Sequence, residues 1–335
     1  MKVAVIGATG FTGEKLIDIL LKHPKVTISY ISAKVQKPFY FASLFPHFKG
    51  KIDLVCDNLN LKKALAAADI VFLALPHRVS FLYAPYFLKG GKRVIDLSAD
   101  YRFKNSSVYK HYYGTEHRDK KNLKEAVYGL PEFFASNIEG AQLIANPGCY
   151  PTASILSLAP LLKEGILNKE DIVIDAKSGI TGAGRHASLD YHYAHLAQNV
   201  RAYKVFEHQH LPEMNHILGE ISKKKISVHF SPHLLPIERG ILITAYGTLK
   251  RKFSHSALIS LYKKHYKGAY FVRVFDDLPQ LKNTLETNYC DIGIAVKEKK
   301  IVIVGCIDNL IKGASGQAVQ NMNIMCGWKQ TLGLV

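Results

Sequence analysis

The chain has 335 residues, and 44 Lys and Arg against 27 Asp and Glu give a formal net charge of +17. At about 100 to 200 residues per domain, this length predicts two domains, each able to bury its own core. Five cysteines without a CxxC pair or metal-ligand spacing argue against a disulfide framework and a structural zinc site. No run approaches the ~18 apolar residues of a membrane span, and no signal peptide is visible. We therefore expect a soluble cytoplasmic protein with reduced thiols.

The excess of Lys and Arg raises the question of nucleic-acid binding, because cations attract phosphate backbones. The lysines are scattered or gathered in short clusters such as 223–225 and 297–300. No helix-turn-helix, zinc finger or RNP-type motif organises them. We interpret the charge as a solvated basic surface that attracts anionic small molecules, and we expect neither a specific nucleic-acid partner nor a membrane partner.

The first thirteen residues predict a strand, a glycine turn and the start of a helix. Residues 2–6 (KVAVI) are apolar, and 7–13 (GATGFTG) have the spacing GxxGxxG rather than GxGxxG. Glycines let the backbone approach a ligand, and the free N–H groups of a helix start hold a pyrophosphate. The alternative is a tight turn without a ligand, but its place after a buried strand favours dinucleotide binding. The cofactor ligands expected here are Gly7, Thr9, Gly10, Phe11, Thr12 and Gly13.

Further apolar strands are predicted at 26–32, 69–75 and 93–97, with helical patterns at 61–68 and 79–88 between them. Strands rich in Val, Ile and Leu without alternation are typical of parallel sheets that are buried on both faces. The first half is therefore predicted to be an α/β, doubly wound, Rossmann-type domain. Ligands of such sheets lie beyond the carboxyl ends of the strands, where Ser32, Pro76 and 98–100 would project.

The cofactor preference follows from the end of the second strand, Ser29-Tyr-Ile-Ser32-Ala-Lys34. NAD-dependent dehydrogenases usually place an acidic residue there to bind the ribose. This segment has none, whereas Ser32 and Lys34 could receive a 2′-phosphate. The sequence therefore predicts NADP rather than NAD.

The second half of the chain has a different strand pattern. Strands predicted at 171–177, 225–231, 241–249, 289–297 and 301–307 alternate apolar and polar residues more often. Alternation indicates a mixed or antiparallel sheet with one open face. A small-residue helix from about 313 to 326 is expected to return to the first domain. We therefore predict a dinucleotide-binding domain at 1–148, completed by 313–335, and an α+β catalytic, substrate and oligomerisation domain with a mixed sheet at 149–312.

Cys149 is the candidate nucleophile. It lies in Asn146-Pro-Gly-Cys149-Tyr-Pro-Thr152, at the start of an apolar helix. A helix N-terminus favours the thiolate, which is the reactive form of cysteine. Most free cysteines simply fill the core, and we interpret Cys56, Cys290, Cys306 and Cys326 in that way. The glycine and prolines around Cys149 build a turn that would expose its side chain.

The candidate acid and base lie in Phe206-Glu-His208-Gln-His210-Leu-Pro-Glu213. An imidazole can shuttle a proton near neutral pH, and a carboxylate beside it can fix its tautomer. The alternative is a solvated polar loop. No metal is predicted, because two His and one Glu without HExxH or a further ligand form an incomplete zinc site.

Three segments place an arginine beside a glycine or a strand end, the geometry in which arginine binds carboxylate or phosphate. They contain Arg102, Ser178 to Arg185, and Arg239. Any one of these arginines alone would be interpreted as a surface or ion-pair residue. Together with a dinucleotide turn and a reactive cysteine, they favour an anionic substrate and the reduction of an acyl phosphate through a thioester.

Seven segments in chain order resemble the N-acetyl-gamma-glutamyl-phosphate reductase (N-acetyl-glutamate semialdehyde dehydrogenase) family. They are GATGFTG (7–13), DLSADYRF (96–103), YGLPE (128–132), NPGCYPT (146–152), SGITGAGR (178–185), HQHLPE (208–213) and DNLIKGASGQAVQN (308–321). The resemblance covers the whole chain. It departs at Gln209, where the family more often has Arg, and in the loop 33–38. The first departure leaves both His208 and His210 as candidates for the acid and base.

The resemblance implies an NADP-dependent oxidoreductase of arginine biosynthesis, a homodimer or homotetramer that reduces N-acetyl-glutamyl 5-phosphate to the 5-semialdehyde. It implies that Cys149 is the nucleophile and His208 the acid and base. The substrate-binding residues implied or inferred are Arg102, Ser178, Arg185, His210, Glu213 and Arg239, and the further cofactor-binding residues are Pro76, Gly179, Gly182 and Asn309. Three alternatives stay open: an N-succinyl or carrier-linked aminoadipyl phosphate as substrate, a Cys/His hydrolase, and a basic nucleotide-binding regulator.

Overall fold

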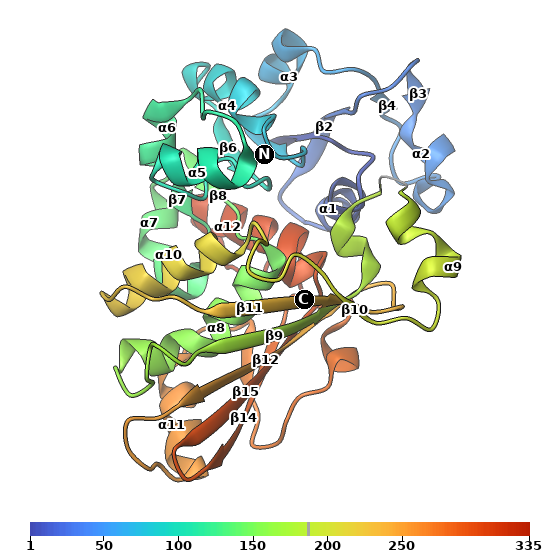
Figure 1. Ribbon diagram of the computed structural model, residues 1–335. Helices are drawn as coiled ribbons and strands as arrows, with labels where there is room; N and C mark the ends of the chain where they lie inside the picture. The colour runs from blue at the N-terminus through green and yellow to red at the C-terminus, as the bar shows by residue number, and fades with distance from the viewer. Residues whose placement is uncertain (186–187) are drawn as a thin grey trace. The chain divides into compact units, whose positions relative to one another are not determined.

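The computed structural model describes residues 1–185 and 188–335, and the chain forms two compact units (Figure 1). Unit 1 comprises Met1–Pro147 and Ala314–Val335, and unit 2 comprises Gly148–Gly313. Unit 1 is thus assembled from both ends of the chain, and unit 2 from the segment between them.

Unit 1 contains a six-stranded sheet in the order β2-β1-β5-β6-β8-β7, with every neighbouring pair parallel. Its strands are β1 Lys2–Ile6, β2 Thr27–Ser32, β5 Ile70–Leu73, β6 Arg93–Asp96, β7 Val127–Tyr128 and β8 Leu143–Ala145. The side chains of the central strand β5 are all buried, as its apolar sequence requires in a sheet covered on both faces. The doubly wound α/β fold predicted from the sequence is confirmed.

Eight α-helices, a 3-10 helix at Pro46–Phe48 and a two-stranded sheet complete the part of unit 1 that the structure describes. The helices are α1 Phe11–Leu21, α2 Phe41–Leu44, α3 Leu61–Ala67, α4 Ser80–Lys89, α5 Ser106–Tyr113, α6 Lys120–Glu125, α7 Pro131–Glu139 and α12 Gly316–Met325. The two-stranded sheet pairs β3 (Phe39–Tyr40) with β4 (Val55–Cys56) in antiparallel orientation. Helix α12, from the end of the chain, packs against α1 and α7. The C-terminal segment is therefore an integral part of this unit.

Unit 2 is built on a seven-stranded mixed sheet in the order β10-β11-β9-β12-β15-β14-β13. The strands are β9 Val173–Ser178, β10 Arg201–Ala202, β11 His229–Leu234, β12 Ile241–Thr248, β13 Val272–Val274, β14 Cys290–Lys297 and β15 Lys300–Ile307. Pairs β9/β11 and β13/β14 are parallel, and the other pairs are antiparallel. In β9 and β12 buried residues alternate with more exposed ones, which confirms the predicted α+β domain with a mixed sheet.

The helices of unit 2 are α8 Cys149–Lys163, α9 Tyr193–Leu196, α10 Leu211–Ser222 and α11 His255–His265. Helix α8 is central: every residue from Tyr150 to Leu162 is buried, and the helix contacts β12, β15, α10 and α11. Across residues 1–185 and 188–335, no helix combines the length and apolar character needed to cross a membrane.

The strand predicted at 225–231 is displaced in the structure, where β11 runs from His229 to Leu234. The N–H of Val228 donates to the Asn215 side chain at 3.0 Å, and pairing with β9 begins only at His229. Pro232 does not end the strand but lies within it. The predicted range was therefore four residues early at its start and three at its end.

Candidate active site

Cys149 is the first residue of α8, as its position after a glycine predicts. The preceding Gly148 is extended (φ −70°, ψ 156°), and no side chain caps the helix. The positive end of the helix dipole thus lies beside the thiol. Cys149 is half-buried, whereas Cys56 and Cys306 are buried. Burial raises the pKa of these two thiols to about 11 and about 12, so neither ionises readily.

Gly313 provides the space beside Cys149. A Cβ at Gly313 would lie 2.8 Å from the Cβ of Cys149 and 3.2 Å from its Cα. The N–H of Gly313 donates to the carbonyl of Asp308 at 2.9 Å, which fixes this turn. Any larger residue at this position would displace the cysteine.

Glu213 holds the turn that carries the cysteine. Its side chain is fully buried near the start of α10, and its Oε1 accepts the N–H of Gly148 at 2.9 Å. A hydrogen bond to a carboxylate is stronger than one between neutral groups. Glu213 therefore positions the residue immediately before Cys149.

Two histidines pack beside the same turn. The rings of His208 and His210 lie 4.8 Å apart between centroids, and they lie 5.4 Å and 6.0 Å from the ring of Tyr150. The N–H of His210 donates to Nδ1 of His208 at 3.1 Å. In a neutral imidazole this bond leaves the proton on Nε2, so His208 presents Nε2 as its proton donor.

Tyr150 and Tyr203 form a phenol pair that the sequence did not reveal. Their hydroxyls lie 3.1 Å apart, and the ring of Tyr203 lies 5.6 Å from that of His208. Burial is the main cause that raises the pKa of both tyrosines, and the charge of the Cys149 thiolate adds to it. The pair therefore stays protonated beside the thiol. Its partners are 53 residues apart, so no local pattern signals it.

The segment after β9 packs tightly on the turn before β12. A Cβ at Gly179 would lie 2.5 Å from the backbone nitrogen of Arg239, so only glycine fits there. Ser178 is buried, and its hydroxyl donates to the carbonyl of Gly179 at 2.9 Å. Gly182 follows in a tighter position, where a Cβ would lie 3.3 Å from the Ser178 hydroxyl and 3.8 Å from the Asn309 amide nitrogen.

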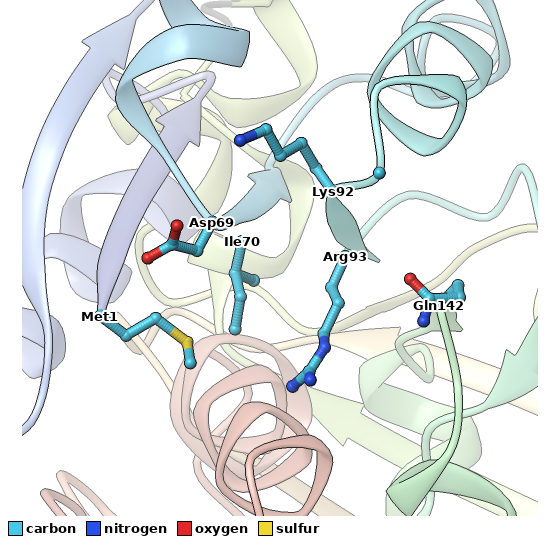
Figure 2. A pocket seen from close by; sticks show the side chains of 7 residues that line it. Met1, Asp69, Ile70, Lys92, Arg93 and Gln142 are labelled. Atoms are coloured by element: carbon cyan, nitrogen blue, oxygen red, sulfur yellow. The ribbon is translucent and has the colours of Figure 1, made fainter.

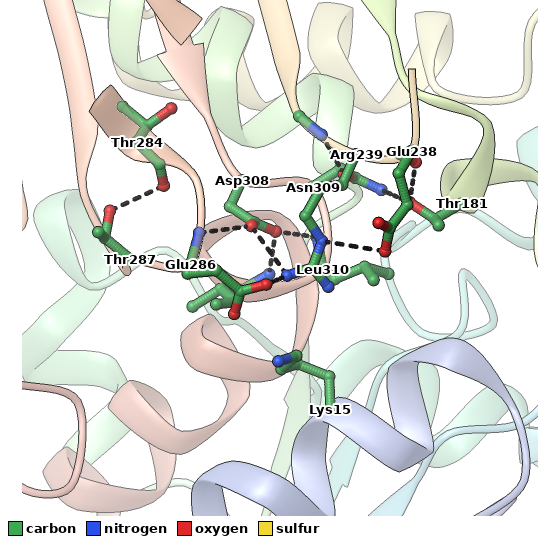
Figure 3. Close-up of polar contacts among 12 residues, drawn as sticks. Lys15, Thr181, Glu238, Arg239, Thr284, Glu286, Thr287, Asp308, Asn309 and Leu310 are labelled. Carbon is green, nitrogen blue, oxygen red and sulfur yellow. Dashed lines mark hydrogen bonds and ion pairs between the residues drawn. The ribbon is translucent and has the colours of Figure 1, made fainter. Parts of the chain in front are cut away.

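Arg239 and Asn309 belong to one polar cluster at the end of the unit 2 sheet (Figure 3). The Asn309 side chain accepts the N–H of Gly240 at 2.6 Å and donates to the Thr181 hydroxyl at 3.0 Å. Arg239 forms an ion pair with Glu286 and lies 3.6 Å from buried Asp308. The oxygen and the nitrogen of the Asn309 amide are thus both hydrogen-bonded inside the protein. The side chain therefore links the segments that carry Thr181, Gly240 and Asn309 itself.

The other two predicted arginines differ in their surroundings. Arg102 lies in unit 1, is 5% exposed, and donates to the carbonyl of Asn146 at 2.8 Å and to that of Leu97 at 3.1 Å. Arg185 lies in unit 2 and is exposed. The structure therefore fixes the orientation of Arg102 and leaves Arg185 at the surface.

The glycine turn of unit 1 has the form that a dinucleotide pyrophosphate needs. Gly7 (φ +95°) would place a Cβ 2.1 Å from the carbonyl oxygen of Ala74, and Gly13 would place one 2.2 Å from that of Gly7. Gly10 precedes α1 without a side-chain cap, and a Cβ there would meet only one atom, at 3.7 Å. Gly7 and Gly13 therefore allow close packing, whereas Gly10 leaves the helix start open beside Thr9, Phe11 and Thr12.

The end of β2 holds this turn in place. The carbonyl of Ser32 accepts the N–H groups of Gly7 and Ala8 at 2.8 and 2.9 Å, while its own hydroxyl is fully enclosed. Lys34 is exposed two residues further on. Asp57 bridges to Ser32 from the chain after β4, an acidic neighbour that sequence reasoning missed because it lies 25 residues away. Pro76 is exposed after β5.

A cavity of about 300 Å³ in unit 1 lies away from this turn. Its lining includes Asp69, Lys92, Arg93 and Gln142, which lie at the amino ends of the parallel strands (Figure 2). Ligands of such sheets bind at the opposite, carboxyl edge. Among the residues that the structure describes, no three His, Cys, Asp or Glu are grouped to hold a metal ion.

Comparison with known proteins identifies the family of the chain. The family described as semialdehyde dehydrogenase, NAD binding domain, matches residues 2–141, and its dimerisation domain matches residues 149–309. Two relatives, from Pelotomaculum thermopropionicum and Geobacter sulfurreducens, are each 44% identical over the whole chain and 97% and 98% of their own lengths. Both are N-acetyl-gamma-glutamyl-phosphate reductases.

A solved structure shows the same fold. Aspartate semialdehyde dehydrogenase II of Vibrio cholerae superposes with a TM-score of 0.72 at 17% identity, over 97% of this chain and 98% of that one. At this identity the likeness concerns the fold alone. On the sequence matches, the chain belongs to the semialdehyde dehydrogenase family, within the group of the N-acetyl-gamma-glutamyl-phosphate reductases.

Proposed function

We propose that this protein reduces N-acetyl-gamma-glutamyl phosphate to the semialdehyde and phosphate in arginine biosynthesis, with NADPH as the reductant. The observation that carries the proposal is Cys149 at the uncapped start of α8, held by Glu213 through Gly148 and followed by Tyr150, whose ring lies beside two imidazoles. This arrangement suits acyl transfer to sulfur. The names of relatives that share 44% of its sequence give the substrate class.

Cys149 is the proposed nucleophile. Its thiolate attacks the acyl carbon, the carbon–oxygen bond to phosphate breaks, and a thioester forms on the sulfur. The N–H groups of the first turn of α8 are placed to stabilise the developing oxyanion. After reduction, the carbon–sulfur bond breaks, and the aldehyde and the thiolate are released.

His208 is the proposed acid and base. Because Nδ1 accepts the N–H of His210, Nε2 is the nitrogen that gives and receives the proton during thioester formation and aldehyde release. We assign His210 and Glu213 to orientation. Arg102, Ser178, Arg185 and Arg239 are proposed to bind the anionic groups of the substrate.

The glycine turn fits a dinucleotide. When bound, NADPH supplies the hydride that reduces the thioester. The open helix start after Gly10 would hold the pyrophosphate, and Lys34 would neutralise the 2′-phosphate at the end of β2. Gly179, Gly182 and Asn309 are proposed to shape the nicotinamide side, and Pro76 the far side of the turn.

We propose a homodimer or homotetramer, because the family domain that matches 149–309 is a dimerisation domain. We also propose the cytoplasm as its location. All five cysteines are free thiols, as a reducing compartment maintains.

Replacement of the nucleophile tests the function. Cys149→Ser is expected to lower turnover at least about 1000-fold, because an alcohol is a far weaker nucleophile, while NADPH binding persists. The matched control is Cys326→Ser, the other half-buried thiol, which should retain activity. Turnover of Cys149→Ser at the wild-type rate would contradict the proposal.

The choice of substrate is tested by kinetics with acetyl, succinyl and carrier-linked acyl phosphates, each with NADPH and NADH. We expect the highest kcat/KM for the acetyl compound with NADPH. Hydrolysis of thioesters without any nicotinamide cofactor would instead support a Cys/His hydrolase.

A further inference from the structure

The loop that joins β5 to α4 (residues 74–79) lies directly against the glycine turn of unit 1. The N–H of Ala74 donates to the carbonyl of Ile6 at 2.8 Å, and Gly7 has no room for a Cβ because of the Ala74 carbonyl. Both segments follow the carboxyl ends of neighbouring parallel strands, β1 and β5. A dinucleotide bound at the turn would therefore meet this loop.

Arg78 gives the loop an unfavourable backbone conformation. Its φ is +72°, in the left-handed region that residues with a Cβ rarely adopt. The side chain is exposed and, within the part of the chain that the structure describes, forms no ion pair. Such strained positions persist where the surrounding structure holds them, and they cluster at functional sites.

The Asp100 carboxylate supplies that stabilisation. It is fully buried after β6, and its Oδ1 accepts the N–H of Arg78 at 2.7 Å while its Oδ2 accepts that of Phe81 at 3.2 Å. The Phe81 N–H belongs to the first turn of α4, whose own N-cap residue Val79 offers no side-chain bond. Asp100 thus caps α4 from 19 residues away and fixes the loop in the same contact.

Two further contacts brace the same region. The Tyr109 hydroxyl donates to Oδ1 of Asp100 at 2.7 Å, and the N–H of Ala99 donates to Nδ1 of His77 in the loop at 3.1 Å. Burial, followed by the negative charge of Asp100, raises the pKa of nearby Asp96 to about 7. The charge of Asp100 therefore disfavours a second negative charge at Asp96.

We propose that Asp100 is a positioning residue for the dinucleotide: by binding the backbone of Arg78 and Phe81, it holds loop 74–79 in the conformation that meets the cofactor at the glycine turn. Asp100 acts through the loop backbone and does not touch the cofactor itself. The inference rests on the proposed function, because it takes NADPH as the ligand.

The experiment compares Asp100→Asn in two backgrounds, wild type and Arg78→Gly, by measuring the dissociation constant of NADPH. Glycine adopts a positive φ without strain, so it should make the Asp100 contact less necessary. We expect Asp100→Asn to weaken NADPH binding about tenfold in the wild-type background and less than about threefold in the Arg78→Gly background. In turnover the loss should appear in the KM for NADPH, with kcat at saturating NADPH nearly unchanged.

A second pair of variants keeps the proposal testable if Asp100→Asn does not fold. Arg78→Val and Arg78→Gly both remove the guanidinium, but valine opposes the left-handed conformation. Arg78→Val should bind NADPH about tenfold more weakly than Arg78→Gly. Equal affinities for these two variants would overturn the proposal.

The control is Asp119→Asn, another carboxylate of this region, which accepts the Tyr101 hydroxyl at 2.7 Å and caps α6 without contacting the loop. It should leave NADPH affinity unchanged. Equal losses from Asp100→Asn in both backgrounds would overturn the proposal, since the effect would then not pass through Arg78. Failure of the wild-type protein to bind NADPH would overturn the proposed function instead.

Discussion

The starts of α1 and α8 have almost the same backbone and different surroundings. Gly10 before α1 has φ −73° and ψ 161°, and Gly148 before α8 has φ −70° and ψ 156°. Neither helix has a side-chain cap. At α1 the N–H of Gly10 donates to the carbonyl of Gly7 at 3.3 Å, and the space around Gly10 is open, whereas at α8 the N–H of Gly148 donates to a buried carboxylate at 2.9 Å.

This difference separates two uses of one helix terminus. An open N-terminus attracts an external anion such as a pyrophosphate. At α8 the Glu213 carboxylate accepts the N–H of Gly148, and the helix start is proposed to stabilise the Cys149 thiolate and the oxyanion that forms beside it. What surrounds the helix start, rather than its backbone, decides whether it binds a ligand or presents a nucleophile.

The largest loss of stability is expected from a substitution that crowds the start of α1. Gly13→Ala places a methyl group 2.2 Å from the carbonyl oxygen of Gly7 and should destabilise unit 1 by about 3 kcal/mol. Gly10→Ala is the matched control for stability, because that position is open and should lose only about 1 kcal/mol. Thermal unfolding measures both. Equal losses would show that the turn is not packed as described.

Gly10→Ala should instead weaken the binding of NADPH. A methyl group over the open helix start would keep a pyrophosphate from the N–H groups, and we expect NADPH to bind about tenfold more weakly. Titration by nicotinamide fluorescence measures this. Unchanged affinity would mean that the pyrophosphate lies elsewhere.

The variant Glu213→Gln tests the role of the carboxylate at the start of α8. Glutamine keeps an acceptor for the Gly148 N–H but removes the charge, so the bond weakens by about 1 kcal/mol. We expect kcat to fall about fivefold to tenfold, with little change in the KM for NADPH. Glu220→Gln, on the exposed face of the same helix, is the control. A comparable fall for both variants would remove the special role of Glu213.

The smallest effect is expected from Lys34, which follows β2 beside the glycine turn of unit 1. Lys34→Ala should raise the KM for NADPH about fivefold and leave that for NADH unchanged, because a single exposed lysine contributes about 1 kcal/mol to binding a phosphate. Lys89, in the last turn of α4, is an exposed control at the other end of the strands. Equal changes with both cofactors would argue against a 2′-phosphate contact at Lys34.

Local patterns were sufficient for much of the fold. The buried runs that became β1 and β5 and the glycine turn before α1 carry their own signals, since burial on both faces and tight turns restrict residue type. The placement of Cys149 at a helix start followed in the same way from the neighbouring glycine and prolines. Edge strands such as β10, with only two residues, carry no such signal.

Contacts between distant segments could not be predicted. The Tyr150–Tyr203 pair, the approach of Asp57 to Ser32 and the capping of α4 by Asp100 each join residues 19 or more positions apart. Asn309 is a further example. Its motif marked the residue as a candidate, but only the folded structure shows that its amide is hydrogen-bonded to Gly240 and Thr181. Side-chain partners depend on the assembled sheet rather than on spacing in the sequence.

Unit 1 consists of two segments, Met1–Pro147 and Ala314–Val335, which are separated in sequence by all of unit 2. The ribosome therefore synthesises these two segments at very different times. Asn321 and Gln317 donate to the carbonyl of Gly129 at 2.8 and 2.9 Å, and the Ser315 hydroxyl donates to that of Thr12 at 2.8 Å. A nascent chain lacks these donors until the last helix emerges, by which time all of unit 2 has been synthesised. All of unit 2 is therefore synthesised before segment 314–335, which unit 1 needs to complete its fold.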